Sequence, residues 1–293
     1  MLSFLTMKPG QESQTAVWVC MGRAIAHDAP WAVGFRDPTA LALLPDAARA
    51  RVERSRAGAA PRGWRERASD RLVTTRAYPM VTRTIAIDAA VREAAAPQLV
   101  LLGAGLDGRA WRMPELRDAV VFEVDHPDSQ RSKRARAAAL APTARDVRFV
   151  AVDFERDRLD DALASAGHDP AAATTWIWEG VVMYLAPSDI AATLAVIERR
   201  SAPASRLVVV YHHPALALRL VRPVMRWIGE PLRSAFTADA MRELLGRYGF
   251  AVVRDQGLPE ISAALSLDIA RKMRAMRHIR ITIADRSRPV PPG

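Results

Sequence analysis

Apolar and polar positions follow one pattern before residue 98 of this chain and a different pattern after it. In residues 1–97, apolar residues recur at spacings of three and four with little alternation, which predicts helices over 15–28, 40–56 and 70–95. From residue 98 onward, short apolar runs alternate with stretches of helical spacing. The runs predict seven strands, near 98–103, 119–124, 147–152, 174–179, 205–211, 250–255 and 278–284. The stretches between them predict helices over 128–140, 157–167, 187–200, 237–249 and 262–276.

Strands and helices that alternate in this way favour one α/β architecture. We expect a doubly wound, mostly parallel seven-stranded sheet with helices on both faces. Residues 1–97 form a helical N-terminal cover that belongs to the same domain as the core, 98–285. Residues 212–236 insert more helical sequence after the fifth strand than a crossover needs, and they are a candidate lid. The tail 286–293 is expected to be disordered.

Composition narrows the class of protein. The chain has 293 residues and is 50% hydrophobic, which is enough to form a core. Its apolar runs are far shorter than the roughly 20 residues that cross a bilayer. The N-terminus has no features of a secretory signal, so a cytoplasmic protein is expected. The single cysteine, Cys20, excludes an internal disulfide, and no metal site is predicted.

The formal charge of +10 raises the question of nucleic acid as a partner. The excess of basic residues is shared between residues 1–97 and 98–293, and there is no basic tail. Proteins that bind nucleic acid usually show a clustered basic footprint and a recognisable module. We therefore expect neither nucleic acid nor membrane as a partner. A basic nucleic-acid-binding protein stays as an alternative, for which salt-sensitive binding would be the evidence.

The first predicted strand ends in a glycine-rich turn. Residues 99–109 read LVLLGAGLDGR, in which Gly103, Gly105 and Gly108 spell G-x-G-x-x-G, and Asp125 lies further along. A dinucleotide-binding fold uses this turn with a carboxylate at about that position. A fold that binds a methyl donor would use nearly the same turn. The glycines alone therefore leave the cofactor open.

Carboxylates at the ends of four successive predicted strands discriminate between the two cofactors. Asp107 follows the first strand, Glu123 and Asp125 end the second, Asp153 ends the third and Glu179 the fourth. Ligands of an open parallel sheet bind at the carboxyl ends of its strands. A rim of carboxylates disfavours a pyrophosphate and suits the ammonium, sulfonium and ribose hydroxyls of S-adenosylmethionine.

The helix after the turn gives a second discriminator. A dinucleotide fold needs a full helix whose N-terminus faces the phosphates, but Pro114 follows Gly108 after only six residues. The surroundings of the turn therefore favour the methyl donor. A NAD(P)-dependent oxidoreductase on a Rossmann fold stays as the main alternative.

Four stretches together resemble the leucine carboxyl methyltransferase family, including its bacterial polyketide-type O-methyltransferase branch. They are LLGAGLDGRAWRM at 101–113, FEVDHPDSQRSKRARA at 122–137, AVDF at 151–154 and WEGVVMYL at 178–185. The resemblance implies a class I methyltransferase fold, which is Rossmann-like, with S-adenosyl-L-methionine as donor and S-adenosyl-L-homocysteine as product. The chain departs from the family at one position, because Gly108 stands where the family usually has threonine in its L-D-T-R turn.

The resemblance also implies roles for individual residues. Those that would bind the donor are Gly103 and Gly105 at its methionine part, Asp125 at the ribose hydroxyls, Asp153 and Phe154 at the adenine, Arg83 at the carboxylate and Glu179 near the amino group. Asp107 and Arg109 are expected to pair and brace the turn.

The acceptor side is less defined by the sequence. A carboxylate acceptor is already ionised near neutral pH, whereas a phenol or alcohol needs a base, and histidine is the usual one. His212 and His213 follow the fifth predicted strand and are the candidates. Arg219 and Arg222 in the candidate lid, together with Tyr211, are candidate substrate contacts.

These inferences predict an S-adenosylmethionine-dependent O-methyltransferase. The expected acceptor is a carboxylate or hydroxyl of a small molecule, plausibly in natural-product (secondary) metabolism. A protein C-terminal carboxylate is the weaker option, because nothing in the sequence indicates a groove for a protein partner. The sequence leaves open whether the chain is a monomer or a homodimer.

Overall fold

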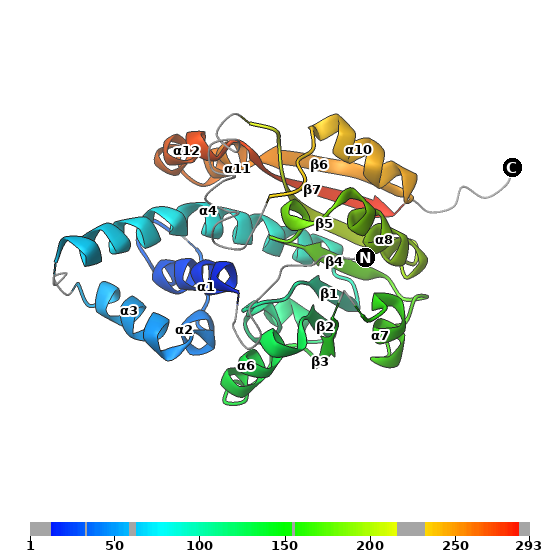
Figure 1. Cartoon of the computed structure of the whole chain (residues 1–293), viewed down its shortest axis with the longest axis horizontal. Coiled ribbons are helices and arrows are strands. Elements are labelled where there is room, and N and C mark those ends of the chain that lie inside the picture. The colour runs from blue at the N-terminus through cyan, green and yellow to red at the C-terminus, as the bar shows by residue number, and fades with distance from the viewer. Residues whose placement is uncertain (1–12, 33, 59–62, 154–155, 216–231, 287–293) are drawn as a thin grey trace, which may run out of the picture.

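The structure is a computed structural model that describes residues 13–32, 34–58, 63–153, 156–215 and 232–286 (Figure 1). Seven strands form one sheet in the order β3-β2-β1-β4-β5-β7-β6. The strands are β1 Gln98–Leu102, β2 Val120–Asp125, β3 Asp146–Ala151, β4 Thr174–Trp178, β5 Arg206–His212, β6 Phe250–Gly257 and β7 Ile279–Arg286. β7 runs antiparallel to both β5 and β6, and the pairs from β3 to β5 are parallel. The predicted mostly parallel, seven-stranded sheet is confirmed.

Helices connect the strands and cover both faces of the sheet (Figure 1). Before the sheet lie α1 Gln14–Ala26, α2 Ala40–Leu43, α3 Asp46–Arg56 and the long α4 Trp64–Ala94. Between and after the parallel strands lie α5 Arg109–Arg112, α6 Pro127–Ala137, α7 Leu159–Ser165 and α8 Pro187–Arg199, followed later by α10 Ala238–Arg247, α11 Leu258–Leu265 and α12 Leu267–Met273. The helical character expected of the N-terminal region is confirmed for its described residues.

Two predicted helices are each split in the structure. The stretch 40–56 breaks at Leu44, which is extended because the next residue, Pro45, disfavours a helical conformation before it. The stretch 262–276 breaks at Ser266, whose φ of −167° is extended, and its first half already begins at Leu258. Spacing of apolar residues did not reveal either break, because it continues across both.

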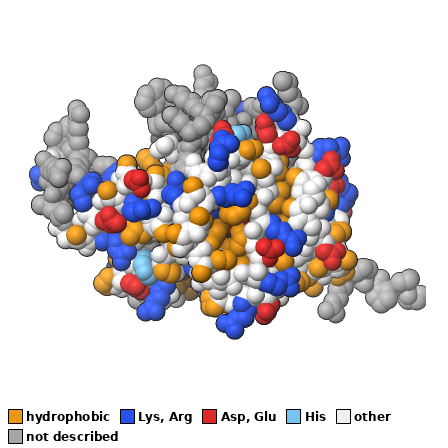
Figure 2. All heavy atoms as spheres, turned by 90° about the horizontal axis from the view of Figure 1, so that it is seen from below, with side chains coloured by type: hydrophobic (Ala, Val, Ile, Leu, Met, Phe, Trp, Pro, Cys, Tyr) orange, Lys and Arg blue, Asp and Glu red, His pale blue; other side chains and the backbone are white. Residues whose placement is uncertain are grey.

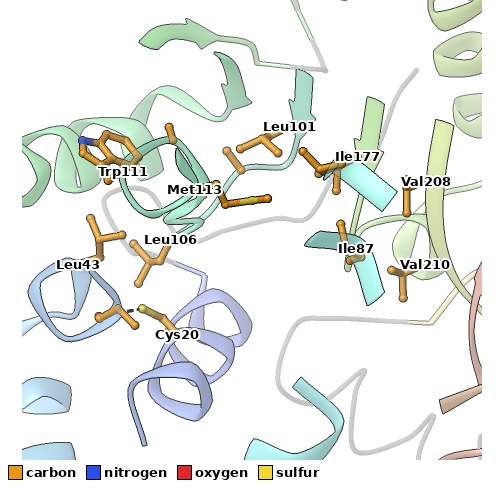
Figure 3. Close-up of a cluster of buried hydrophobic side chains, with 14 of the residues drawn as sticks. Cys20, Leu43, Ile87, Leu101, Leu106, Trp111, Met113, Ile177, Val208 and Val210 are labelled. Carbon is orange, nitrogen blue, oxygen red and sulfur yellow. Dashed lines mark hydrogen bonds between the residues drawn. The ribbon is translucent and has the colours of Figure 1, made fainter. Parts of the chain in front are cut away.

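The two faces of the sheet have separate apolar cores. On one face, which we call the cover face, the sheet residues Leu101, Ile177 and Val208 pack with residues of α1, α2, α4, α5, α6, α11 and α12 (Figure 3). On the opposite face, Trp176 and Val209 pack with residues of α7, α8 and α10. The sheet is therefore doubly wound, and the N-terminal helices share the core of the cover face.

Surface charge is mixed on the face of the molecule shown in Figure 2. Lys and Arg side chains are interspersed there with Asp and Glu side chains, and apolar side chains are visible between them. On this face the net charge of +10 does not take the form of a single basic patch.

Candidate functional site

The turn after β1 can be formed only by residues without a side chain at its two sharpest points. Gly103 and Gly105 have φ of 74° and 49°, in the left-handed region that favours glycine. A Cβ on Gly103 would lie 2.5 Å from Cγ2 of Val181, and a Cβ on Gly105 would lie 3.0 Å from Cβ of Ala16. Both positions therefore require glycine, because the left-handed backbone and the neighbouring side chains leave no room for a Cβ. The short helix expected after the turn is confirmed, since α5 has four residues.

Asp125 at the end of β2 is hydrogen-bonded to this turn. One carboxylate oxygen accepts the backbone N–H of Gly105, and the other accepts that of His126 at 2.7 Å. Burial raises the pKa of Asp125, and these hydrogen bonds oppose the rise. Each carboxylate oxygen has a second lone pair, so Asp125 can still accept a hydrogen bond from each of two neighbouring hydroxyls.

The register of the sheet places three of the predicted residues in one row. Leu101 pairs with Ile177 on β4 and with Glu123 on β2. Leu102 pairs with Val124 and Trp178, so the residues that follow these three, Gly103, Asp125 and Glu179, form a row at the carboxyl edge of the sheet. The strand order reverses between β1 and β4, and the crevice at such a reversal is where open α/β sheets bind ligands.

Asp153 lies at the same edge, two residues beyond the end of β3. It is partly exposed, and its backbone N–H donates to Asp157 Oδ2 at 2.9 Å. Its predicted companion Phe154 lies outside the described residues. The structure thus brings Asp125, Asp153 and Glu179 to one edge of the sheet.

Eight charged side chains form a connected ionic network behind the turn. Its members are Arg23, Asp37, Arg83, Asp88, Asp107, Arg109, Arg112 and Glu179. Arg109 is the central member, because it contacts Asp107, Asp88 at 2.8 Å and Glu179 at 3.1 Å. The four arginines and four carboxylates of this ionic network balance in charge. The predicted pairing of Asp107 with Arg109 is confirmed.

The network keeps its carboxylates ionised despite their burial. Burial by itself would raise the pKa of Glu179, but the charges of Arg83 and Arg109 outweigh it and hold that pKa below its ordinary value. The pKa of Asp107 and of Asp88 is lowered in the same way by neighbouring arginines. Fixed negative charge is therefore present at the end of β4 over the physiological pH range.

Arg83 and Glu179, which the resemblance assigns to opposite ends of the donor's amino acid part, contact each other. Arg83 Nε lies 2.6 Å from Glu179 Oε1, and both side chains are largely buried. The Arg83 guanidinium has two further nitrogens, and Glu179 Oε2, which accepts from Arg109 at 3.1 Å, keeps a second lone pair. The pair can therefore present a cation and an anion side by side to a zwitterion.

Sequence reasoning missed half of the ionic network. Arg23 and Asp88 were not singled out, although each is a charged residue within an otherwise apolar helical stretch, MGRAIA and IAIDAAV. Both are almost fully buried, at 3% exposure. Such isolated charges in apolar stretches were the available signal, while Asp37 and Arg112 gave none.

Gly108, the departure from the family turn, is also explained by a contact. A Cβ there would collide with Oγ1 of Thr39, a hydroxyl that donates to Asp37 Oδ1 at 2.7 Å. Thr39 belongs to the segment before α2, so the hydroxyl absent at Gly108 is replaced in space by one from the N-terminal helices.

Glu123 does not take part in the row of carboxylates, although the sequence grouped it with Asp125. It is fully buried within the cover face, where its Oε2 lies 2.7 Å from Nζ of Lys133 on α6. Burial raises the pKa of Glu123 to about 7, and Lys133 opposes the rise. Lys133 also lies 5.2 Å from the ring centroid of Trp111.

Tyr211 was a candidate substrate contact, and the structure gives it a different environment. Its side chain is fully buried on the opposite face, and its hydroxyl donates to Asp255 Oδ2 at 2.7 Å. Burial and Asp255 raise the pKa of this hydroxyl. Tyr211 therefore joins β5 to β6. It points away from the cover face, since alternate residues of a strand face opposite sides of the sheet, and its burial keeps it from a substrate.

The other acceptor-side candidates divide into two groups. His212 and His213 lie at the end of β5, the first in the strand and the second directly after it. Arg219 and Arg222 lie outside the described residues, as does most of the candidate lid.

Within the described ranges, no group of three or more His, Cys, Asp or Glu side chains is arranged to hold a metal ion, and no helix is both long and apolar enough to span a membrane.

The strand order with an antiparallel β7 defines the fold as that of the class I methyltransferases. Residues 16–198 match the model of the leucine carboxyl methyltransferase family, and no match to a dinucleotide-binding family is needed to explain the glycine turn. The chain belongs to this family.

Relatives and solved structures agree with this assignment. A protein of Streptomyces avermitilis, provisionally named an S-adenosyl-L-methionine-dependent methyltransferase, is 35% identical over 217 residues, which is 69% of each chain. One from Mycobacterium sp. (strain JLS) with the same provisional name is 39% identical over 137 residues, 46% of each chain. The chain thus spans about half the length of the Mycobacterium relative. S-adenosylmethionine is the methyl donor named for these relatives.

Two solved structures share the fold at low sequence identity. One is a DUF574 family protein from Streptomyces avermitilis, with a TM-score of 0.57 and 15% identity, covering 94% of this chain and 98% of the other. The second, from Thermobifida fusca, has a TM-score of 0.55 and 15% identity, covering 96% and 97%. At this identity the likeness shows the fold alone.

Proposed function

We propose that this chain transfers a methyl group from S-adenosyl-L-methionine to an oxygen atom of a small molecule. The observation that carries the proposal is the level row of Asp125, Gly103 and Glu179 at the point where the strand order reverses. Bare backbone in the centre of this row, with carboxylates on either side, suits a cationic donor that carries a ribose. A pyrophosphate would find no helix N-terminus of sufficient length after this turn, since α5 has only four residues.

The donor's parts match the residues of the row and its neighbours. The bare backbone at Gly103 and Gly105 would face the methionine part, and Asp125 would accept from the ribose hydroxyls. Asp153, at the end of the neighbouring β3, would meet the adenine. The partly open hydrogen-bonding capacity of Asp125 supports this placement.

Arg83 and Glu179 would hold the amino acid end of the donor. The donor's carboxylate would bind the guanidinium of Arg83, and its ammonium would bind Glu179, whose lowered pKa keeps it ionised. Binding of the donor would weaken the Arg83–Glu179 ion pair, and the two new ion pairs with the donor would offset that loss. The donor supplies an activated methyl group on a sulfonium when it is bound.

The protein's contribution to such a transfer is alignment of acceptor, methyl carbon and sulfur. Positioning of this kind contributes on the order of 7–11 kcal/mol in well-oriented reactions. The acceptor we propose is a carboxylate or hydroxyl of a natural product, within secondary metabolism. The family's name supports the carboxylate, and the polyketide-type branch that the sequence resembles supports the hydroxyl.

Calorimetric titration tests the donor site directly. We expect S-adenosyl-L-homocysteine to bind saturably and NAD or NADP not to bind. Asp125→Ala should weaken S-adenosyl-L-homocysteine by at least about tenfold, since hydrogen bonds to a charged group contribute about 1.5–3 kcal/mol. Asp239→Ala, which removes an exposed carboxylate on α10, is the matched control. Saturable NAD binding, or equal affinity in the two variants, would refute the proposed donor site.

A further inference from the structure

Two histidines meet at the carboxyl end of β5. His212 is the last residue of β5, and His278 directly precedes β7, whose first residue Ile279 pairs with His212. The two ring centroids lie 5.3 Å apart, with the ring planes at 82°. Because β7 is antiparallel to β5, its beginning lies at the same edge of the sheet as the glycine turn.

The register places His212 next to the proposed donor site. Trp178 of β4 pairs with Val209 of β5, so Glu179 lies level with Val210. His212 is two residues further along and points to the same cover face as Val210 does. His212 therefore lies on the strand next to Glu179, about two residues closer to the carboxyl edge of the sheet.

His212 is uncharged at neutral pH. Burial, together with His278 and Arg83, lowers its pKa to about 4, and burial also lowers the pKa of His278. The charged groups around it are Arg83 from α4 and the partner of Arg83, Glu179, which follows β4. An uncharged imidazole can accept a proton or a hydrogen bond, whereas it offers no positive charge to an anion.

The two neighbouring histidines differ in what remains of their hydrogen-bonding capacity. Nδ1 of His213 lies 3.0 Å from the backbone oxygen of Pro214, so this nitrogen carries a proton in that contact. Nδ1 of His212, in contrast, is buried and has no hydrogen-bond partner within the described part of the chain. Buried polar atoms of proteins are usually paired, so this nitrogen keeps capacity for a hydrogen bond with a ligand.

We propose that the methyl acceptor is a neutral hydroxyl compound, an alcohol or a phenol, and that His212 takes its proton during transfer. This inference rests on the proposed methyl transfer. A carboxylate has no proton to give at neutral pH and would need a cation; among the described residues the arginine that acts on His212 is Arg83, which faces Glu179. His278 is a positioning residue, because it acts through its ring contact with His212.

The step balances with His212 as the proton acceptor. The acceptor oxygen forms a bond to the methyl carbon, and the carbon–sulfur bond breaks with its electron pair left on sulfur. The O–H bond breaks as the oxygen loses electron density, and its proton passes to a ring nitrogen of His212. A lowered pKa then favours release of that proton from His212 to water before the next turnover.

Histidine NMR of the complex with S-adenosyl-L-homocysteine tests the acceptor class without turnover. The probes are monophenols and aliphatic alcohols, each compared with the matching carboxylic acid, and His212→Gln identifies the His212 signals. We expect the hydroxyl compounds to shift the His212 signals and the acids to leave them unchanged. Shifts caused by the acids, or by no member of the panel, would overturn the proposal.

Kinetics of His212→Gln separates proton transfer from a purely structural role. With a phenol acceptor, kcat at pH 7 should fall about 10²–10⁴-fold, the usual contribution of a general base. The loss should shrink as the pH rises toward about 10, where phenols ionise by themselves. His27→Gln, which changes a histidine directly after α1, is the matched control and should keep kcat. A loss that is independent of pH would overturn the assignment of the proton to His212.

Binding of S-adenosyl-L-homocysteine distinguishes the two proposals. If His212→Gln binds it as the unaltered protein does and both His212 tests fail, only the acceptor proposal is wrong. If the unaltered protein does not bind it, the proposed methyl transfer itself is wrong.

Discussion

The two faces of the sheet bury different kinds of side chain. On the cover face, the ionic network and the Glu123–Lys133 pair lie beside apolar residues such as Leu101. On the opposite face, Trp176 and Leu194 are fully buried among apolar neighbours, and the polar indole N–H donates to Ser201 Oγ at 2.8 Å. Charge reaches this face in a smaller group, the Asp255–Arg280 pair, in which Asp255 accepts from the Tyr211 hydroxyl. Glu179, one of the donor-binding candidates, belongs to the ionic network of the cover face.

This difference separates stability from function. Apolar burial and neutral hydrogen bonds stabilise a fold at little desolvation cost, whereas buried ions must be fully paired to be tolerated. The cover face keeps its ions in a balanced set, and this set holds Glu179 and the turn at Asp107 in place. The opposite face therefore supports the sheet, and the cover face prepares it for a charged ligand.

Among changes that test the difference between the two faces, Arg109→Ala is expected to have the largest effect on stability and on donor binding. The change leaves Asp107, Asp88 and Glu179 without their shared cation, and removing one partner of buried ions costs about 3–5 kcal/mol. Urea unfolding should show this loss, and calorimetry should show weaker binding of S-adenosyl-L-homocysteine. Arg254→Ala, which breaks an exposed pair, is the control and should change stability by less than about 1 kcal/mol. Equal losses of unfolding free energy in the two variants would mean that the ionic network stabilises the fold no more than an exposed ion pair does.

The second effect concerns the Glu123–Lys133 pair. Lys133→Met leaves Glu123 buried without a cation and should lower the free energy of unfolding by about 3–5 kcal/mol. The double variant Lys133→Met/Glu123→Leu should regain most of that loss, because apolar residues of similar volume replace such pairs well. Urea unfolding of both variants measures the difference. A double variant no more stable than Lys133→Met would show that the pair is needed for more than charge compensation.

Leu194→Ala tests the opposite face. Leu194 on α8 is fully buried, and its truncation should lower the free energy of unfolding by about 2–5 kcal/mol through the cavity that it leaves. At a temperature where the variant is folded, S-adenosyl-L-homocysteine should bind with unchanged affinity by calorimetry. A loss of affinity comparable to that of Arg109→Ala would contradict the inference that the opposite face stabilises the fold without contributing to ligand binding.

The smallest effect is expected in the pH dependence of stability. The folded-state pKa of Glu179 lies below its ordinary value of 4.5, so its stabilisation is present above that pH and is lost as the pH falls through the folded pKa. Each such group contributes up to about 1.4 kcal/mol per pH unit in this window. Urea unfolding between pH 6 and 3 should therefore give a shallower acid decline for Glu179→Gln than for the unaltered protein. Parallel curves would contradict the pairing of Glu179 with arginine.

Much of the fold could be predicted from local patterns. All seven predicted strands lie within two residues of the observed ones at every end, because each strand is a short apolar run bounded by polar residues. The turn at Gly103 and the carboxylate at Asp125 were also visible, since each lies at the end of such a run. The breaks at Leu44 and Ser266 were not, because apolar spacing continues across them.

The site could be predicted as a set of positions but not as a set of contacts. Asp107 and Arg109 are two residues apart, and their pairing was predicted. Arg83 and Glu179 are distant in the chain, and nothing in either segment shows that they meet at 2.6 Å. The same holds for His212, whose partner His278 comes from the far side of β6 in the sequence.

The sequence by itself determined which elements form and which strand ends carry charge, because hydrophobic periodicity and turn residues act over a few neighbouring positions. Only the tertiary structure decided which charge faces which. In the folded chain Glu123 forms a buried pair with Lys133, and Tyr211 faces away from the cover face. Glu179 lies in the row with Asp125. The reason is physical: side-chain pairing depends on strand register and helix packing, which long-range burial sets once the chain is folded.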